Sequence, residues 1–377
     1  MATVQEGLEG VAALESDICR VSDGRLRYRG YEIDDLAANV SFEECAYLLL
    51  HEDLPTPAEL VAFRRELDAE GHLPPGVVQG LHVLPKGVVP MAALRTAVSL
   101  LGHFDPEAES TAPEANRRKA VRLLAKTGPV IGAYDRIRRG LEPVPAQAGQ
   151  SIAWNFLWCL SGKEPGAGQE RSIDLALVLH AEHELNPSTL CAREAAATRT
   201  DLYSAVVAAI AALKGPLHGG ATEQVLEMLQ RIGPDADVEA WLDAALARGE
   251  RIMGFGHRVH KHGDPRTRWM RELAGRLTKG TPVEPLFRTS ERLEALVAAK
   301  KRLFPNVDFH GATAYAALGI APDLFTPIFA LSRTSGWCAH VLEQYADDRF
   351  VRPRAAYAGA RDRDVVPLSE RGQDPPS

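Results

Sequence analysis

The chain has 377 residues, of which 45% are hydrophobic and 25% are charged, so it can bury a large core and is expected to divide into two lobes. Its 43 lysine and arginine residues face 50 aspartate and glutamate residues, and the formal net charge of -7 argues against a nucleic-acid binder that works through bulk positive charge. Any anionic ligand must therefore be met by a local group of arginines.

The cysteines and the first residues of the chain point to the cytoplasm. The five cysteines are scattered, odd in number and without metal-ligand spacing, which suits free thiols in a reducing compartment. Residues 1–7 have neither a basic region nor an apolar core, and the longest apolar stretch, residues 205–213, is far shorter than the roughly 20 residues that a membrane-spanning helix needs. We expect a soluble cytoplasmic protein.

In chain order, the predicted elements begin with a short hairpin and continue as helices. Residues 25–29 alternate in character and could place residues 19–31 in a hairpin. Apolar side chains then recur at three- and four-residue spacing through most of the chain, in residues 42–50, 60–67, 91–101, 117–138, 173–183 and 226–232. The sequence predicts an all-α fold whose charged tail, residues 361–377, is expected to fray.

His218 lies at a break between two predicted helices. Asp201 is a good N-cap for an apolar helix through Leu213, Gly215-Pro216 ends that helix, and a second helix begins near Gly219. The positive end of the second helix disfavours an imidazolium, so a neutral His218 could donate a hydrogen bond to a developing oxyanion. A loop histidine that only caps the helix is the alternative.

Residues 254–266 carry two glycines and several cations. Gly254 and Gly256 allow the backbone to approach a ligand closely, and Lys261 and Arg266 add positive charge within reach of the same turn. This pattern predicts an anion-binding loop, with a solvated basic turn as the alternative. The missing third glycine excludes a dinucleotide-binding fingerprint.

The histidines also allow a metal-site interpretation. His180 and His183 are spaced i, i+3 and could face one way, and residues 257–262 hold three more histidines. No HExxH motif is present, and no cysteine or carboxylate completes a familiar ligand set, so we expect no metal.

Asp308 follows Pro305-Asn306 in an otherwise apolar stretch and could be an ordinary turn or cap residue. As a general base it would gain from burial, which raises the pKa of an aspartate from its ordinary value of about 3.9. Asp308 would suffice for a carbon acid only if neutral histidines stabilise the enolate, each preorganised donor being worth on the order of 10²–10³ in rate. Three arginines from separate segments would suit a small dicarboxylate if they converge, namely Arg266, Arg333 and Arg352.

Seven ordered blocks of residues resemble the citrate synthase family across nearly the whole chain. The blocks are Tyr28-Arg29-Gly30-Tyr31-Glu32-Ile33; His180-Ala181-Glu182-His183-Glu184 with Ser188-Thr189; Gly215-Pro216-Leu217-His218-Gly219-Gly220; Gly254-Phe255-Gly256-His257-Arg258-Val259 with Asp264-Pro265-Arg266; Pro305-Asn306-Val307-Asp308; Arg333-Thr334-Ser335-Gly336-Trp337 with His340; and Arg352-Pro353-Arg354. The resemblance implies an all-α homodimer, each chain having a large domain (residues 1–220 and 325–377) and a smaller domain (residues 221–324) that closes over the active site.

The resemblance also implies a role for each matched residue. Asp308 would take a methyl proton from acetyl-CoA, His218 would hydrogen-bond the thioester oxygen, and His257 would polarise the oxaloacetate carbonyl and protonate the new alkoxide. The residues that would bind oxaloacetate are His183, Arg266, Arg333 and, across the dimer, Arg352. Those that would contact coenzyme A are Gly254, Phe255, Gly256 and Lys261.

The implied function is that of citrate synthase, a transferase of the tricarboxylic acid cycle that also hydrolyses citryl-CoA to citrate and CoA. It needs no metal or redox cofactor, with acetyl-CoA as cosubstrate. A 2-methylcitrate synthase using propionyl-CoA is the nearer alternative, because one methylene is worth only roughly 1–3 kcal/mol of discrimination. Phe309-His310-Gly311 departs from the aromatic-then-small pattern of related bacterial enzymes and leaves the size of the acyl pocket open. A non-catalytic helical binding protein with the same fold is the more distant alternative.

Overall fold

The computed structural model of the chain describes residues 7, 10–234, 236–256, 259–260, 263–360 and 363–371. It has two compact units, Ser16–Phe350 and a terminal unit that joins Met1–Glu15 with Val351–Ser377. The terminal unit contains the 3-10 helix η3 (Leu368–Glu370). The predicted fraying of the tail concerns residues that lie partly outside the described ones, and it stays a prediction. In the described part of the chain, no helix is both long and apolar enough to cross a membrane.

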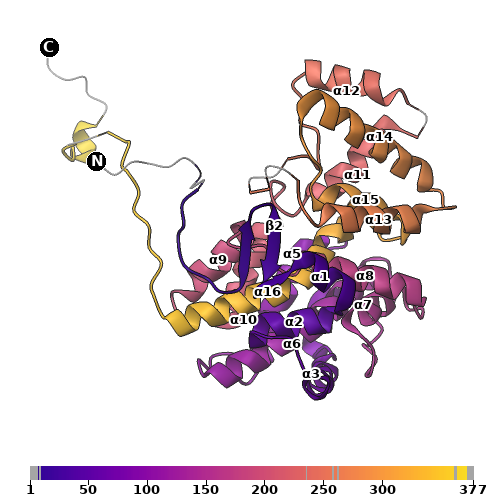
Figure 1. Ribbon diagram of the computed structural model, residues 1–377. Helices are drawn as coiled ribbons and strands as arrows, with labels where there is room; N and C mark the ends of the chain where they lie inside the picture. The colour runs from indigo at the N-terminus through magenta and orange to yellow at the C-terminus, as the bar shows by residue number, and fades with distance from the viewer. Residues whose placement is uncertain are drawn as a thin grey trace, which may run out of the picture. The chain divides into compact units, whose positions relative to one another are not determined.

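The Ser16–Phe350 unit is helical, as the sequence predicts, with one small antiparallel sheet near its start (Figure 1). The strands, in spatial and chain order, are β1 (Cys19–Ser22), β2 (Arg25–Tyr28) and β3 (Tyr31–Glu32). Asp23 and Gly24 connect the first two strands with φ of 55° and 72°, the left-handed geometry that a two-residue hairpin turn requires. The predicted hairpin is therefore confirmed.

The helices before residue 221 surround a long helix near the end of the unit. They are α1 (Ile33–Asn39), α2 (Phe42–His51), α3 (Pro57–Glu70), α4 (Pro75–His82), α5 (Pro90–His103), α6 (Pro113–Arg138), α7 (Ile152–Ser161), α8 (Ala167–His180), α9 (Pro187–Ala196) and α10 (Leu202–Leu213). Several begin with proline, whose missing amide hydrogen is no loss at the first helical position.

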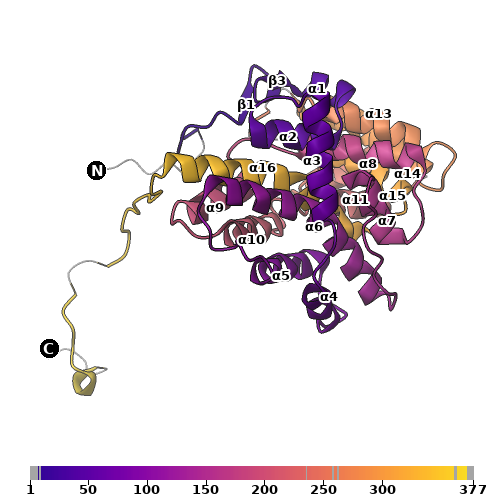
Figure 2. The same ribbon diagram turned by 90° about the horizontal axis from the view of Figure 1, so that it is seen from below.

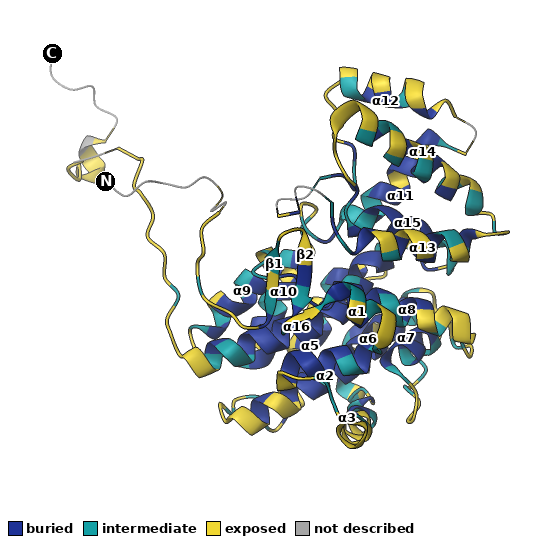
Figure 3. Cartoon of the chain, viewed as in Figure 1, coloured by how far each residue is buried: buried dark blue, intermediate teal, exposed yellow. Residues whose placement is uncertain are grey.

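The long helix is α16 (Phe325–Asp347), which follows the 3-10 helix η2 (Pro322–Leu324). It packs against α2, α5, α6, α8, α9 and α10, and Figure 2 shows it running between α2 and α9. Its middle is buried, as the dark colour in Figure 3 indicates. Because other helices cover it, each polar side chain in its middle must find a partner inside the protein or face a ligand.

The remaining helices pack mainly on one another. They are α11 (Ala221–Ile232), α12 (Val238–Ala247), α13 (Thr267–Thr278), α14 (Glu284–Lys301) and α15 (Val307–Ala317). Helix α15 contacts α11, α13 and α14, and the five helices carry neighbouring labels in Figure 1. This grouping is compatible with a smaller domain over residues 221–324, and the division into two domains stays a prediction.

The predicted helices lie where the sequence places them, with one boundary that is wrong. The apolar pattern predicts a helix over residues 173–183, whereas α8 ends at His180. Pro187 disfavours helical geometry at Asn186, whose side chain instead caps α9, and Glu184 adopts a φ of 50°. Residues 181–186 therefore form a connection between two helices, and this connection carries His183.

Candidate active site

Two short backbone segments pair and thereby place the start of helix α15. Gly254 and Gly256 have φ of 81° and 79°, which glycine adopts without strain. The Gly256 amide donates to the Phe304 carbonyl, and the Asn306 amide donates to the Gly254 carbonyl, each at 2.9 Å. Asn306 then caps α15 by accepting from the Asp308 amide at 3.2 Å. The glycine loop and the carboxylate of Asp308 are thus parts of one local structure.

Asp308 is half-buried in the first turn of α15 and contacts a residue of α11. Its Oδ1 accepts a hydrogen bond from the Thr222 hydroxyl at 2.7 Å. Burial raises the pKa of Asp308 above its ordinary value, while the Thr222 hydrogen bond and the charges of Arg266 and Arg333 oppose that rise. The carboxylate is therefore a stronger base than an exposed aspartate, as removal of a proton from carbon requires.

His218 lies three residues before α11, and its ring contacts Ser188 in α9. His218 Nε2 is 2.9 Å from Ser188 Oγ. Burial, and after it the charge of Arg333, lowers the pKa of His218 to about 4, so its imidazole is neutral at pH 7. The neutral state expected from the sequence thus arises from burial and a nearby arginine, whereas the sequence pattern had suggested the helix terminus as its cause.

The proton of Ser188 decides which nitrogen of His218 can donate to a ligand. Ser188 Oγ accepts from the Trp337 indole at 3.1 Å and in this structure donates to Asn186 Oδ1 at 2.7 Å. The hydroxyl can donate its single proton either to Asn186 or to His218 Nε2. Donation to His218 leaves the ring proton on Nδ1, which then becomes the donor available to a ligand.

Arg333 is 1% exposed in the middle of α16 and has no carboxylate partner among the described residues. Its Nε donates to the His180 carbonyl at 2.8 Å, and its guanidinium lies over the Phe329 ring, 4.6 Å from the centroid. It forms no ion pair with any residue that the structure describes, and burial lowers its pKa. A buried charge without a counter-ion costs free energy, so an anionic ligand would supply the missing negative charge.

Arg266, by contrast, is already paired inside the protein. Its Nε and Nη2 donate to Oδ1 and Oδ2 of Asp264 at 2.9 and 2.7 Å, and its Nη1 lies 3.4 Å from the Leu179 carbonyl. Although burial acts in the opposite direction on both groups, the pairing lowers the pKa of Asp264 and raises that of Arg266. Arg266 therefore has less of its guanidinium left for a ligand than Arg333 has.

His183 is 7% exposed, and its ring contacts the imidazole of His260. Its Nε2 lies 2.9 Å from His260 Nε2, so one of these rings donates and the other accepts. Burial lowers the pKa of His260, and the charge of Asp264 opposes that change. The backbone amide of His183 donates to Glu182 Oε1 at 2.8 Å.

The predicted site residues differ in how far the structure describes them. The charge of Arg333 acts on both Asp308 and His218, and that of Arg266 acts on Asp308, so these groups lie within electrostatic reach of one another. His257 and Lys261 lie outside the described residues. Arg352 is exposed and belongs to the terminal unit. The role of each predicted site residue stays a prediction.

The structure adds four contact residues that have no role in the sequence-based prediction. Ser188 and Asp264 stand inside the blocks that resemble the citrate synthase family, so those blocks could have drawn attention to them. Thr222 lies in the first turn of α11, and nothing in the sequence marks it as a contact of Asp308. His260 is one of three histidines in its loop, and nothing in the sequence distinguishes it from the other two.

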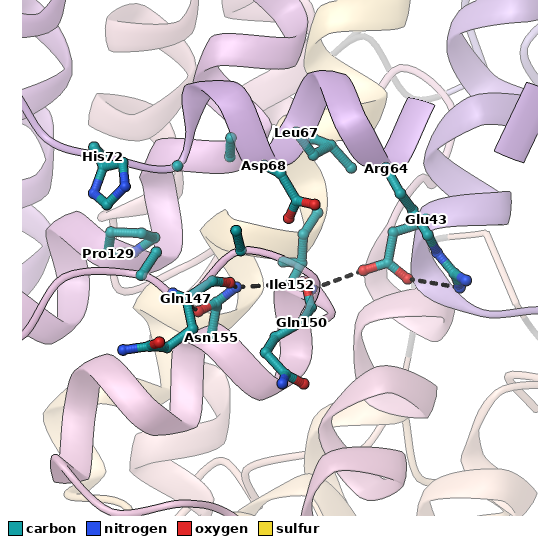
Figure 4. Close-up of a pocket in the computed structure, with 14 residues that line it drawn as sticks. Glu43, Arg64, Leu67, Asp68, His72, Pro129, Gln147, Gln150, Ile152 and Asn155 are labelled. Atoms are coloured by element: carbon teal, nitrogen blue, oxygen red, sulfur yellow. Dashed lines mark hydrogen bonds and ion pairs between the residues drawn. The ribbon is translucent and has the colours of Figure 1, made fainter. Parts of the chain in front are cut away.

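A separate pocket lies between α2, α3, α6 and α7 (Figure 4). Its lining includes Glu43, Arg64, Asp68 and Asn155, and it contains none of the predicted site residues. Among the residues that the structure describes, no group of three histidine, cysteine, aspartate or glutamate side chains is arranged to hold a metal ion.

The fold and the site together define a class of protein: a helical protein that brings a partly buried carboxylate and a neutral imidazole within electrostatic reach of a buried arginine. Comparison with known proteins then gives the family. The sequence profile described as "Citrate synthase, C-terminal domain" matches residues 7–354. The chain is 50% identical to citrate synthase 2 of Bacillus subtilis over 370 residues, which cover 98% of this chain and 100% of that protein.

Two further comparisons agree. The chain is 41% identical to the 2-methylcitrate synthase of Shewanella oneidensis over 372 residues, covering 97% of each protein. It matches the ternary complex of citrate synthase from Thermoplasma acidophilum with carboxymethyl coenzyme A and oxaloacetate at a TM-score of 0.93 and 30% identity, covering 98% of this chain and 100% of that one. The chain belongs to the citrate synthase family. The family and the all-α fold predicted from the sequence are both confirmed.

We predict that His218 is neutral between pH 6 and 8, because burial and Arg333 lower its pKa to about 4. Nitrogen-15 NMR of histidine-labelled protein, with the His218 signals assigned from a His218→Gln variant, would report one protonated and one unprotonated ring nitrogen over this range. Two protonated nitrogens at pH 7 would contradict the prediction.

Proposed function

We propose that this protein is a citrate synthase that condenses acetyl-CoA with oxaloacetate and hydrolyses citryl-CoA to citrate and CoA. The observation that carries the proposal is Arg333, a buried cation that forms no ion pair in the described part of the chain. Its charge acts on both Asp308 and His218. A dicarboxylate bound at Arg333 would stand beside a strengthened base and a neutral donor. These are the groups needed to make a nucleophile from a thioester and add it to a carbonyl.

The first step is proton transfer from carbon. Asp308 takes a proton from the methyl group of acetyl-CoA, and the electron pair of the broken C–H bond moves onto the thioester oxygen. His218, donating from Nδ1, stabilises this enolate, which requires Ser188 to donate its proton to His218 Nε2. Because the pKa of His218 is low, the ring donates a hydrogen bond without first having to lose a proton.

The second step forms the carbon–carbon bond. The enolate carbon attacks the keto carbon of oxaloacetate, and the keto oxygen becomes an alkoxide that takes a proton from His257, a role that rests on the family resemblance. Water then cleaves the thioester of citryl-CoA, releasing citrate and the CoA thiol. We propose that no metal or organic cofactor takes part.

The substrates would be held by groups from several segments. Arg333, Arg266 and His183 would hold oxaloacetate, joined by Arg352 of the partner subunit in a homodimer. The loop of Gly254, Phe255 and Gly256, together with Lys261, would contact coenzyme A, because its positive-φ glycines allow the backbone to approach a ligand closely. We also propose that the smaller domain closes over the bound substrates and that the protein works in the cytoplasm.

A 2-methylcitrate synthase remains the alternative. His310, which the sequence left unassigned, is fully buried and places its Nε2 2.9 Å from Glu294 Oε2. Phe309 packs against Phe255 with ring centroids 4.5 Å apart. Neither contact favours the longer acyl chain, and the difference of one methylene amounts to only about 1–3 kcal/mol.

We predict that the wild-type protein releases thiol from acetyl-CoA in the presence of oxaloacetate at least about 10-fold more efficiently than from propionyl-CoA, a ratio within the discrimination that one methylene allows. Asp308→Asn, which keeps the shape but not the base, should lower kcat by at least about 10³-fold. Both are measured by a thiol-reactive chromophore. Equal or better propionyl-CoA turnover would support 2-methylcitrate synthase instead, and no release with either substrate would refute the proposed activity.

We predict that Thr222→Val moves the acid limb of kcat/KM to higher pH by about one unit, since a hydrogen bond to a charged group is worth about 1.5–3 kcal/mol. The base works when ionised, so activity is lost as pH falls through the pKa of Asp308. Removing the Thr222 hydroxyl takes away a donor that stabilises the ionised form, which raises that pKa further. Thr222→Ser keeps the donor and should leave the limb in place. An unshifted limb in Thr222→Val would argue against Asp308 as the base.

A further inference from the structure

A chain of buried polar groups links helices α9 and α16 to the connection that carries His183. Arg193 Nη1 lies 3.2 Å from His340 Nδ1, His340 Nε2 lies 3.1 Å from Glu182 Oε1, and the same Oε1 accepts from the His183 amide. Arg193, His340 and Glu182 are each no more than 1% exposed. None of the proposed steps of the reaction uses these three side chains.

The partners of His340 fix the position of its proton. A guanidinium can only donate, so His340 Nδ1 must be the acceptor of the Arg193 hydrogen bond. The ring proton is therefore on Nε2, from which it is donated to the Glu182 carboxylate. The direction of each hydrogen bond is then set, from Arg193 through His340 to Glu182, and His340 is neutral.

The carboxylate of Glu182 is enclosed and lies very close to helix α16. Its Oε2 is buried and accepts no hydrogen bond from the residues that the structure describes. A Cβ added at Gly336 would collide with that oxygen, so α16 approaches the carboxylate as closely as a glycine permits. Leaving a carboxylate oxygen buried and without a donor costs free energy, and such a cost calls for a compensating role.

The positive charge that Glu182 can compensate is that of Arg333, which lies on α16 together with Gly336. Among the charged groups that act on Arg333, Glu182 contributes most to keeping it protonated. No ion pair joins Glu182 to Arg333, so the carboxylate stabilises the buried cation from a short distance without occupying its guanidinium donors. Arg333 thus stays charged and available to a ligand.

We propose that Glu182 is a positioning residue for the dicarboxylate substrate: oriented by His340, its carboxylate holds the backbone of His183 and supplies negative charge to Arg333, while the Nη donors of Arg333 bind no residue that the structure describes. The inference rests on the proposed function for the identity of the ligand as oxaloacetate. The hydrogen-bond chain itself is independent of that function.

The first test addresses the hydrogen-bond chain in the unmodified protein. Nitrogen-15 NMR at pH 7, with signals assigned from His340→Gln, should find His340 protonated at Nε2 and unprotonated at Nδ1. A proton on Nδ1, or an imidazolium at pH 7, would overturn the proposal whether or not the protein has the proposed activity.

The second test separates positioning from stability. Glu182→Gln keeps the shape of the side chain and removes its charge, so KM for oxaloacetate should rise by about 10-fold or more, while kcat at saturating oxaloacetate and KM for acetyl-CoA change by less than about 3-fold. Glu182→Asp, which keeps the charge, should recover part of the lost affinity. An unchanged KM for oxaloacetate in Glu182→Gln would show that Glu182 is only structural.

Glu43→Gln is the matched control. Glu43 is also 1% exposed, also accepts from one backbone amide, that of Ile152 at 2.7 Å, and also has a buried Oε2 without a hydrogen-bond partner among the described residues. It lies in the pocket of Figure 4, which contains none of the site residues. Its substitution should change thermal stability without changing KM for oxaloacetate, and a rise in KM equal to that of Glu182→Gln would overturn the proposal.

Discussion

The buried charge of Arg333 is the constraint on which the rest of the site depends. Helix α16 is enclosed by other helices, and a guanidinium in its middle cannot reach water to be solvated. The His180 carbonyl, the face of Phe329 and the charge of Glu182 offset part of the desolvation cost of the guanidinium. A bound anion would offset the rest. The same charge lowers the pKa of His218 and limits the rise in the pKa of Asp308, so one cation adjusts both groups proposed for proton chemistry.

The groups around this cation are held by connections between helices. Residues 181–186 connect α8 to α9, with Glu184 at positive φ and Pro187 restricting Asn186. Asn186 caps α9 and accepts from the hydroxyl of Ser188. On the other side, the positive-φ glycines at 254 and 256 let the chain pair with residues 304–306, which fixes the start of α15. Helices thus determine where the functional side chains lie, and short glycine-containing or capped segments determine where they point.

Features that depend on neighbouring residues could be predicted from the sequence. Periodic apolar residues gave the helices, alternation gave the hairpin, and compact motifs singled out Asp308, His218 and Arg333. The contacts that orient them could not be predicted, because they join distant positions: Thr222 and Asp308 are 86 residues apart, and Glu182 and His340 are 158 apart. Nor could the sequence reveal that Asp264 pairs with Arg266 while Arg333 forms no ion pair with any described residue. The predicted end of α8 is wrong because the spacing of apolar residues does not show where a helix stops.

The most direct measurement is a calorimetric titration of oxaloacetate into the wild-type protein and into Arg333→Gln. If the substrate supplies the counter-charge, the wild type should bind one oxaloacetate per chain, and the variant should lose at least about 100-fold in affinity, as expected when one partner of a buried charge pair is removed. Oxaloacetate binding with unchanged affinity in Arg333→Gln would contradict the central role given to this charge.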